Sequence, residues 1–167
     1  SAFDLKIGDE AWKISEGIRP SNLELETIKS RSDRIRPQNY ENSERYFLFE
    51  KGCIYLAKID NKLQLPSNIN GRATGKSSIG RLDIITRLLT DSNTEYDVVD
   101  AGYSGPLYLL IVPQTYSIKI PLGKSLNQLR LFNGPPHVST ITHYNIGHYG
   151  KPFWYKLDGE SWEGIIG

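Results

Sequence analysis

Gly75-Lys76-Ser77-Ser78-Ile79-Gly80-Arg81-Leu82-Asp83 is the stretch of the chain that says most about its fold. It places two cations and two hydroxyls within six residues, on a backbone that Gly75 and Gly80 leave easy to bend. Short hydroxyls and peptide N–H groups can reach phosphate oxygens, and Lys76 and Arg81 can neutralise their charge. The spacing is not that of a P-loop. The segment is therefore either an anion cradle or a serine-capped loop.

Two downstream segments share this mixture of glycine and polar residues. The first is Val99-Asp100-Ala101-Gly102-Tyr103-Ser104-Gly105, and the second is Gly123-Lys124-Ser125-Leu126-Asn127-Gln128-Leu129. Asp100 either accepts a hydrogen bond from a ligand hydroxyl or caps its own turn. Gln128 either supports a ligand or satisfies buried backbone groups. The local chemistry of each segment leaves both alternatives open.

Taken in order, the three segments resemble motifs of the dCTP deaminase/dUTPase superfamily. Its members carry an Arg/Lys-Ser-Ser-x-x-Arg element, then hydrophobic-Asp-x-Gly-aromatic-x-Gly, then Gly-x-x-hydrophobic-x-Gln-Leu. The segment Ser1–Gly8 is similar to the start of dCTP deaminases. Gly80–Asp83 and Gly102–Tyr108 look most like the N-terminal half of the long, two-domain bacterial dCTP deaminases.

The resemblance implies a mainly β fold, a dUTPase-like distorted jelly-roll of antiparallel strands with little helix. We expect this domain at residues 1–134 and, at 135–167, a connector that leads towards a missing second domain. The chain contains no Met, and we interpret it as a piece of a longer protein. The resemblance also implies a bacterial, cytoplasmic homotrimer with nucleotide sites at the subunit interfaces.

The implied activity is hydrolytic deamination of dCTP to dUTP in pyrimidine deoxynucleotide metabolism, without a catalytic metal. The ligand would be a deoxynucleoside triphosphate, dCTP or dUTP, accompanied by Mg²⁺. Six positions of the motifs would bind it: Lys76, Ser77, Ser78, Arg81, Asp100 and Gln128. Ser77 and Arg81 would also be the catalytic contacts to the reacting base.

The sequence departs from the family pattern at the general base. Family members carry a Glu five residues after the last Gly of the Asp-x-Gly-aromatic-x-Gly motif, and here that position is Leu110. A leucine cannot accept a proton, and general acid–base catalysis is typically worth about 10²–10⁴-fold. The other carboxylates to consider are Asp83, Glu95 and Asp97. Two alternatives stay open: a catalytically silent trimerisation or nucleotide-sensing half, and a dUTP diphosphatase.

Composition and charge narrow the classes of partner and of metal site that the chain could have. A net charge of +1 over 167 residues predicts neither a nucleic-acid nor a membrane partner, and no apolar run is long enough to span a bilayer. The single cysteine, Cys53, excludes a zinc deaminase, which needs a Cys pair. We interpret His137, His143 and His148 as structural because their spacing fits no common metal site. The basic cluster Arg34–Arg36 is interpreted as a solvated face.

Hydrophobic patterning predicts a chain made mostly of strands. Alternation predicts a strand at Ala2–Ile7, and Glu50–Gly52 indicates a hairpin between Tyr46–Phe49 and Cys53–Ile59. Ser67–Thr74 is rich in Asn, Gly and Ser and is predicted to be a loop. Ile79–Leu89 has helical spacing, but the resemblance favours one helical turn followed by extended chain, which is our prediction.

Overall fold

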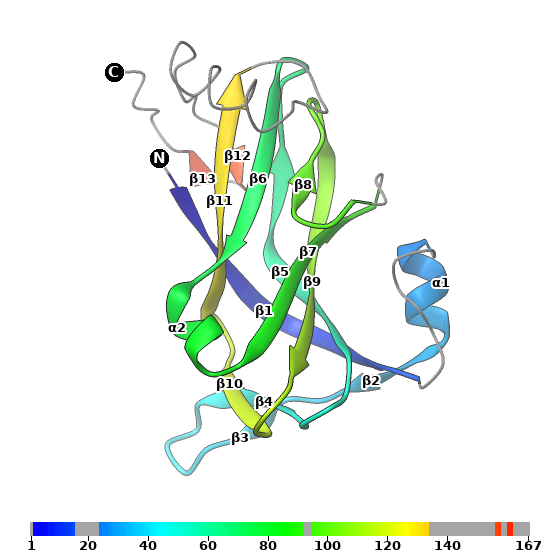
Figure 1. Cartoon of the computed structure of the whole chain (residues 1–167), viewed down its shortest axis with the longest axis vertical. Helices are drawn as coiled ribbons and strands as arrows, with labels where there is room; N and C mark the ends of the chain where they lie inside the picture. The colour runs from blue at the N-terminus through cyan, green and yellow to red at the C-terminus, as the bar shows by residue number, and fades with distance from the viewer. Residues whose placement is uncertain (1, 16–23, 92–94, 134–155, 158–159, 162–167) are drawn as a thin grey trace.

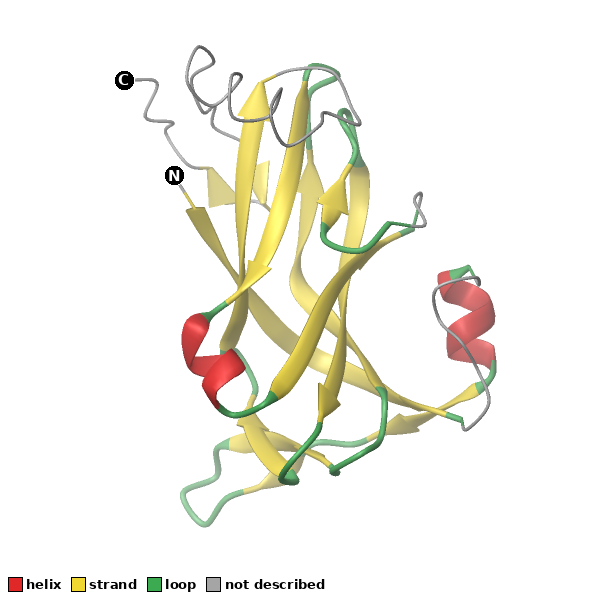
Figure 2. Ribbon diagram, in the orientation of Figure 1, coloured by secondary structure: helices red, strands yellow, loops and turns green. Residues whose placement is uncertain are grey.

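The computed structural model describes residues 2–15, 24–91, 95–133, 156–157 and 160–161. Strands dominate this part of the chain, and only two short helices occur in it (Figure 2). The elements, in order, are β1 (Ala2–Ile14), α1 (Leu25–Ser30), β2 (Ser32–Ile35), β3 (Gln38–Asn39), β4 (Arg45–Phe49), β5 (Tyr55–Gln64), β6 (Ile69–Gly75), α2 (Ser77–Arg81), β7 (Ile84–Thr90), β8 (Val98–Val99), β9 (Ser104–Pro113), β10 (Ile118–Pro121), β11 (Ser125–Asn133), β12 (Lys156–Leu157) and β13 (Glu160–Ser161).

Strand β1 forms the corner of the fold. Its first half pairs with β11, which continues through β6 to β8, while its second half pairs with β2 and β5. The register shifts at Leu5/Lys6 and again between Ile7 and Ala11. Such irregularities let one strand pass from one sheet to the next. The sheet therefore curls around its own core, with β11, β6 and β8 on one side and β5, β9 and β7 on the other (Figure 1).

A second, three-stranded sheet, in the order β10-β4-β3, lies at one end of the curled sheet (Figure 1). Its residues Phe47 and Phe49 are fully buried and join the main core, where Phe49 packs edge-on against Tyr55 at 4.8 Å between ring centroids. Every strand pair among the described residues is antiparallel. The predicted mainly β, distorted jelly-roll fold is confirmed.

The segment Ile79–Leu89 follows the prediction of one helical turn and then extended chain. Helix α2 ends at Arg81, and Asp83 takes a positive φ of 56° before β7 begins at Ile84. Helical spacing alone would have extended α2. Pairing with β9 decides otherwise, because it supplies backbone hydrogen bonds along the whole of β7.

The loop predicted at Ser67–Thr74 is wrong, since residues 69–75 form β6 between β11 and β8. Glycine was the misleading signal. A Cβ atom built on Gly71 would lie 3.0 Å from Leu129 Cδ1 and 3.2 Å from Leu131 Cδ2. Gly71 is needed because two leucine side chains cover its backbone closely, and not because the chain turns there.

The hairpin predicted between Tyr46–Phe49 and Cys53–Ile59 is also wrong. The turn exists, with Gly52 at φ 77°, and Gly52 N–H donates to Pro113 O at 2.8 Å. The two strands do not pair with each other: β4 pairs with β10 and β3, and β5 pairs with β1, β9 and β12. The turn therefore joins two sheets. Cys53 precedes β5 and is partly buried against the core.

The predicted connector at 135–167 lies mostly outside the described residues. Its described parts, β12 and β13, pair with each other, and Leu157 of β12 pairs with Leu63 of β5. His137, His143 and His148 fall outside the described residues, and the boundary at residue 134 stays a prediction. Among the described residues, no helix has the length and apolar character needed to cross a membrane.

Candidate functional site

Helix α2 and the residue before it present the predicted phosphate-binding side chains at the surface. Buried Ile79 anchors the helix, while Ser77, Ser78 and Arg81 are exposed. No ion pair to Arg81 and no side-chain hydrogen bond of either serine occurs among the described residues. The helix thus offers two hydroxyls and one guanidinium group that are available to an anion.

Lys76 is joined to the predicted Gln128 through a residue that sequence reasoning missed. Lys76 Nζ lies 3.2 Å from Asp4 Oδ2, and Gln128 Nε2 lies 3.5 Å from Asp4 Oδ1. The sheet explains this cluster, because Asp4 pairs with Gln128 and Gln128 pairs with Thr74, next to the cradle. Both partners of the ion pair are partly exposed, so the pair positions Lys76 but adds at most about 1 kcal/mol to stability.

A buried polar pair, Thr86 and Asn127, lies against the backbone of Gly75, just before the cradle residues Lys76–Arg81. Thr86 Oγ1 donates to Asn127 Oδ1 at 2.7 Å, and Asn127 is completely buried. Asn127 Nδ2 has no hydrogen-bond partner among the described residues. A Cβ atom on Gly75 would lie 3.1 Å from Thr86 Oγ1, so the backbone approaches this pair closely. Alternation along β11 was the signal that could have placed Asn127 inward and Gln128 outward.

Asp100 lies in a tight turn that the structure places away from the cradle. Tyr103 N–H donates to Asp100 O at 3.1 Å, and Gly102 has φ 79°. Val99 pairs with Gly71, so Asp100 lies beside residue 70, six residues before Lys76. At about 3.3 Å per residue, this separates the two by roughly 20 Å along β6. Within one chain, the predicted site residues do not all come together.

Leu110 lies on β9 and is buried. Alternate residues of β9 face opposite sides, and Leu110 packs in a second apolar cluster with Tyr108, Leu56 and Leu89 and with Leu25 and Ile28 of α1. The position at which the family pattern places its general base is therefore occupied by a buried apolar side chain that packs in an apolar cluster, with Arg87 as its strand partner on β7.

The other carboxylates that the sequence suggested have structural partners or lie at the surface. Asp83 Oδ2 accepts a hydrogen bond from Thr115 Oγ1 at 2.6 Å, which ties the end of α2 to the turn after β9. Asp97 Oδ1 accepts from the Leu88 N–H at 2.8 Å, and burial raises the pKa of this carboxyl. Glu95 is exposed. These bonds give Asp83 and Asp97 a role in holding β7 in place.

The described residues contain no group of three or more His, Cys, Asp or Glu side chains that could hold a metal ion. The cradle cluster itself has one carboxylate, Asp4, beside the cation Lys76. This donor set suits a bound anion better than a bound cation.

Comparison with known proteins identifies the family. Residues 1–135 match the family described as the 2'-deoxycytidine 5'-triphosphate deaminase N-terminal domain. The chain belongs to the dCTP deaminase family. Two relatives of this family, both described as "dCTP deaminase, dUMP-forming", come from Parafrankia sp. and Nanoarchaeum equitans. They are 31% identical over 134 residues and 30% identical over 147 residues, and cover 79% and 81% of this chain.

A crystal structure of 2'-deoxycytidine 5'-triphosphate deaminase from Agrobacterium tumefaciens is similar to this chain with a TM-score of 0.70 and 33% identity. The match covers 80% of this chain and 39% of that one. Of the two curated relatives, the chain spans 61% and 71% of the length. The chain therefore corresponds to one part of longer dCTP deaminases.

Proposed function

We propose that this chain is the nucleotide-binding part of a dCTP deaminase whose parent reaction converts dCTP to dUTP and ammonia. The observation that carries this proposal is the set of available groups on α2, Ser77, Ser78 and Arg81, beside Lys76. Three or four such donors suit a triphosphate, because each charge-assisted hydrogen bond is about twice as strong as a neutral one.

The roles within the cradle follow from charge and reach. Lys76 and Arg81 bind the phosphate oxygens of Mg²⁺–dCTP, and Ser78 adds a hydroxyl donor. Ser77 and Arg81 also contact the reacting base, and Gln128 supports Lys76 through Asp4. In the reaction, water adds to cytosine C4 and ammonia leaves, with the substrate's Mg²⁺ as the sole metal.

The proton transfers of this reaction need a general base, and we propose that this chain lacks one at the position where the resemblance places it. Leu110 stands at the corresponding position and is buried in an apolar cluster that includes residues of α1. We therefore expect the 167-residue chain to bind nucleotide without turning it over. The residues that complete catalysis would lie elsewhere in the parent protein.

The assembly we propose is a homotrimer with each nucleotide site shared between copies. The separation of Asp100 from Lys76 by roughly 20 Å supports this, since a neighbouring copy could supply the Asp100 side chain that the same chain cannot. We further propose a hydrolase of the bacterial cytoplasm. The free, partly buried Cys53 is compatible with a reducing compartment.

The test is calorimetric titration of Mg²⁺ complexes of dCTP, dUTP and dTTP into the purified chain, with products separated from the same samples. The separation must resolve dUTP from dUMP, because the relatives are described as dUMP-forming. We expect binding without product. Arg81→Gln should weaken binding about 10–100-fold, as loss of hydrogen bonds to a charged partner predicts. The control Arg31→Gln, at the exposed C-cap residue just after α1, should leave binding unchanged.

Three results would contradict the proposal. Turnover of dCTP that Arg81→Gln abolishes would show that the chain has its own base. Failure to bind any of the three nucleotides would show that the residues Lys76–Arg81 do not form a nucleotide site, and would leave an assembly role for this domain. Release of diphosphate from dUTP would instead favour the dUTP diphosphatase alternative.

A further inference from the structure

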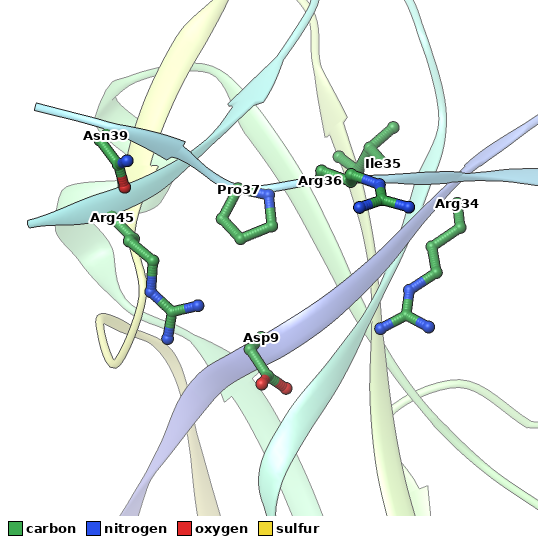
Figure 3. A pocket seen from close by; sticks show the side chains of 7 residues that line it. All are labelled: Asp9, Arg34, Ile35, Arg36, Pro37, Asn39 and Arg45. Atoms are coloured by element: carbon green, nitrogen blue, oxygen red, sulfur yellow. The ribbon is translucent and has the colours of Figure 1, made fainter.

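A cationic pocket lies where β1, β2, β3 and β4 meet (Figure 3). Three arginines line it: Arg34 on β2, Arg36 just after β2, and Arg45 at the start of β4. Its volume of about 610 Å³ lies within the range of small-molecule sites. The basic cluster Arg34–Arg36, interpreted from the sequence as a solvated face, therefore gains a third arginine and a concave surface in the fold.

The charge of this pocket is only partly offset by the residues that line it. None of the three guanidinium groups has an ion pair within 4.0 Å among the described residues. Asp9 of β1 is the one carboxylate among the lining residues, and in Figure 3 the guanidinium groups of Arg34 and Arg45 lie on either side of it. Three positive charges and one negative charge leave an excess of two, in a chain whose net charge is only +1.

We propose that this pocket binds a small molecule that carries two or more phosphate groups. Guanidinium groups bind phosphate through two parallel N–H···O bonds, which arginine can form and lysine cannot. Asn39 adds amide donors at the rim, and Ile35 and Pro37 give one wall an apolar, conformationally restricted surface. The excess charge of the lining matches a diphosphate or triphosphate rather than a single carboxylate.

The pocket is separate from the cradle at α2. Asp4 contacts Lys76 in the cradle, and Asp9 lines the pocket, five residues further along β1. At about 3.3 Å per residue, the two lie roughly 16 Å apart along the strand. The inference does not depend on the proposed function, because the two sites share none of their phosphate-binding side chains.

The experiment titrates inorganic pyrophosphate into the 167-residue chain carrying Lys76→Gln and Arg81→Gln, so that the cradle is removed. We expect saturable binding with one molecule per chain. Adding Arg34→Gln or Arg45→Gln should weaken it about tenfold or more. Arg130→Gln, an exposed arginine on β11, is the matched control and should have no effect. Asp9→Asn should tighten binding about two- to fivefold, because it removes one repulsive charge.

Comparing the affinities of inorganic triphosphate and dCTP distinguishes a free polyphosphate from a nucleotide as the ligand of this pocket. Equal affinities indicate a site that recognises phosphate alone, and tighter dCTP binding indicates contacts to the nucleoside as well. The proposal is overturned if pyrophosphate fails to bind, or if Arg130→Gln weakens binding as much as Arg45→Gln does. It is also overturned if only a single-stranded oligonucleotide binds through these arginines.

Discussion

The hydroxyl of Tyr103 stabilises the motif Asp100–Gly105, and its removal gives the sharpest test of how that motif is built. Tyr103 is 6% exposed. Its hydroxyl donates to Pro106 O at 2.5 Å and accepts from the Asp91 N–H at 3.2 Å, so that it joins the end of β7 to the start of β9. A Cβ atom on Gly105 would lie 2.8 Å from this oxygen, so the glycine is what allows the contact.

The expected cost of Tyr103→Phe follows from the groups left behind. The substitution keeps the ring and leaves one backbone donor and one backbone acceptor without their partner, which costs about 1–3 kcal/mol. For a chain of this size, that corresponds to a fall in melting temperature of about 3–9 °C. Tyr116→Phe makes the same chemical change on a residue that is 73% exposed and should cost less than about 0.5 kcal/mol.

Urea unfolding followed by circular dichroism measures both variants on one scale. The pH dependence gives a second readout. Burial raises the pKa of Tyr103 to about 12, from 10.0. The neutral phenol therefore contributes stability that is fully present below pH 10.0 and is lost as the pH rises towards 12. Tyr103→Phe should lose less stability across that window than the wild type does. Equal stabilities of Tyr103→Phe and Tyr116→Phe would refute the reasoning.

Three further substitutions test other parts of the structure. Gly71→Val should destabilise the protein by about 1–3 kcal/mol in urea, because its Cβ would meet Leu129 Cδ1 at 3.0 Å; unchanged stability would mean that β6 is not so closely covered. Asp97→Asn should be at least as stable as the wild type near pH 7, because burial raises the pKa of this carboxyl and disfavours its charged form. The stability advantage of the variant should shrink as the pH falls through that pKa. A less stable variant at pH 7 would show that the carboxylate charge is needed. Asp4→Asn should change dCTP affinity by no more than about fivefold and should alter the salt dependence of that affinity, because it releases Lys76 from a partly exposed ion pair. A loss of affinity as large as that of Arg81→Gln would show that Asp4 itself contacts the nucleotide.

The candidate site was predictable in its chemistry and less so in its arrangement. Ser77, Ser78 and Arg81 lie on α2, where they are available to an anion, and Lys76 lies just before the helix. Leu110 could be assigned by counting along a motif, and its burial in an apolar cluster agrees with its side chain. Asp4 was not predicted as a site residue, because its contact with Lys76 joins residues 72 positions apart. Asp100 could not be located relative to the cradle, since only the pairing of β8 with β6 fixes that separation.

By itself, the sequence determined the features that depend on neighbours along the chain. The turn at Gly52 and the strand that begins β1 at Ala2–Ile7 follow from local composition and alternation. The change from helix to strand after Arg81 was expected from the resemblance and against helical spacing, and the pairing of β7 with β9 accounts for it. The tertiary structure decided which strands pair, and therefore that Ile69–Gly75 is a strand and that three arginines form a pocket. Each β ladder joins segments far apart in the sequence, so its stability depends on partners that no local window contains.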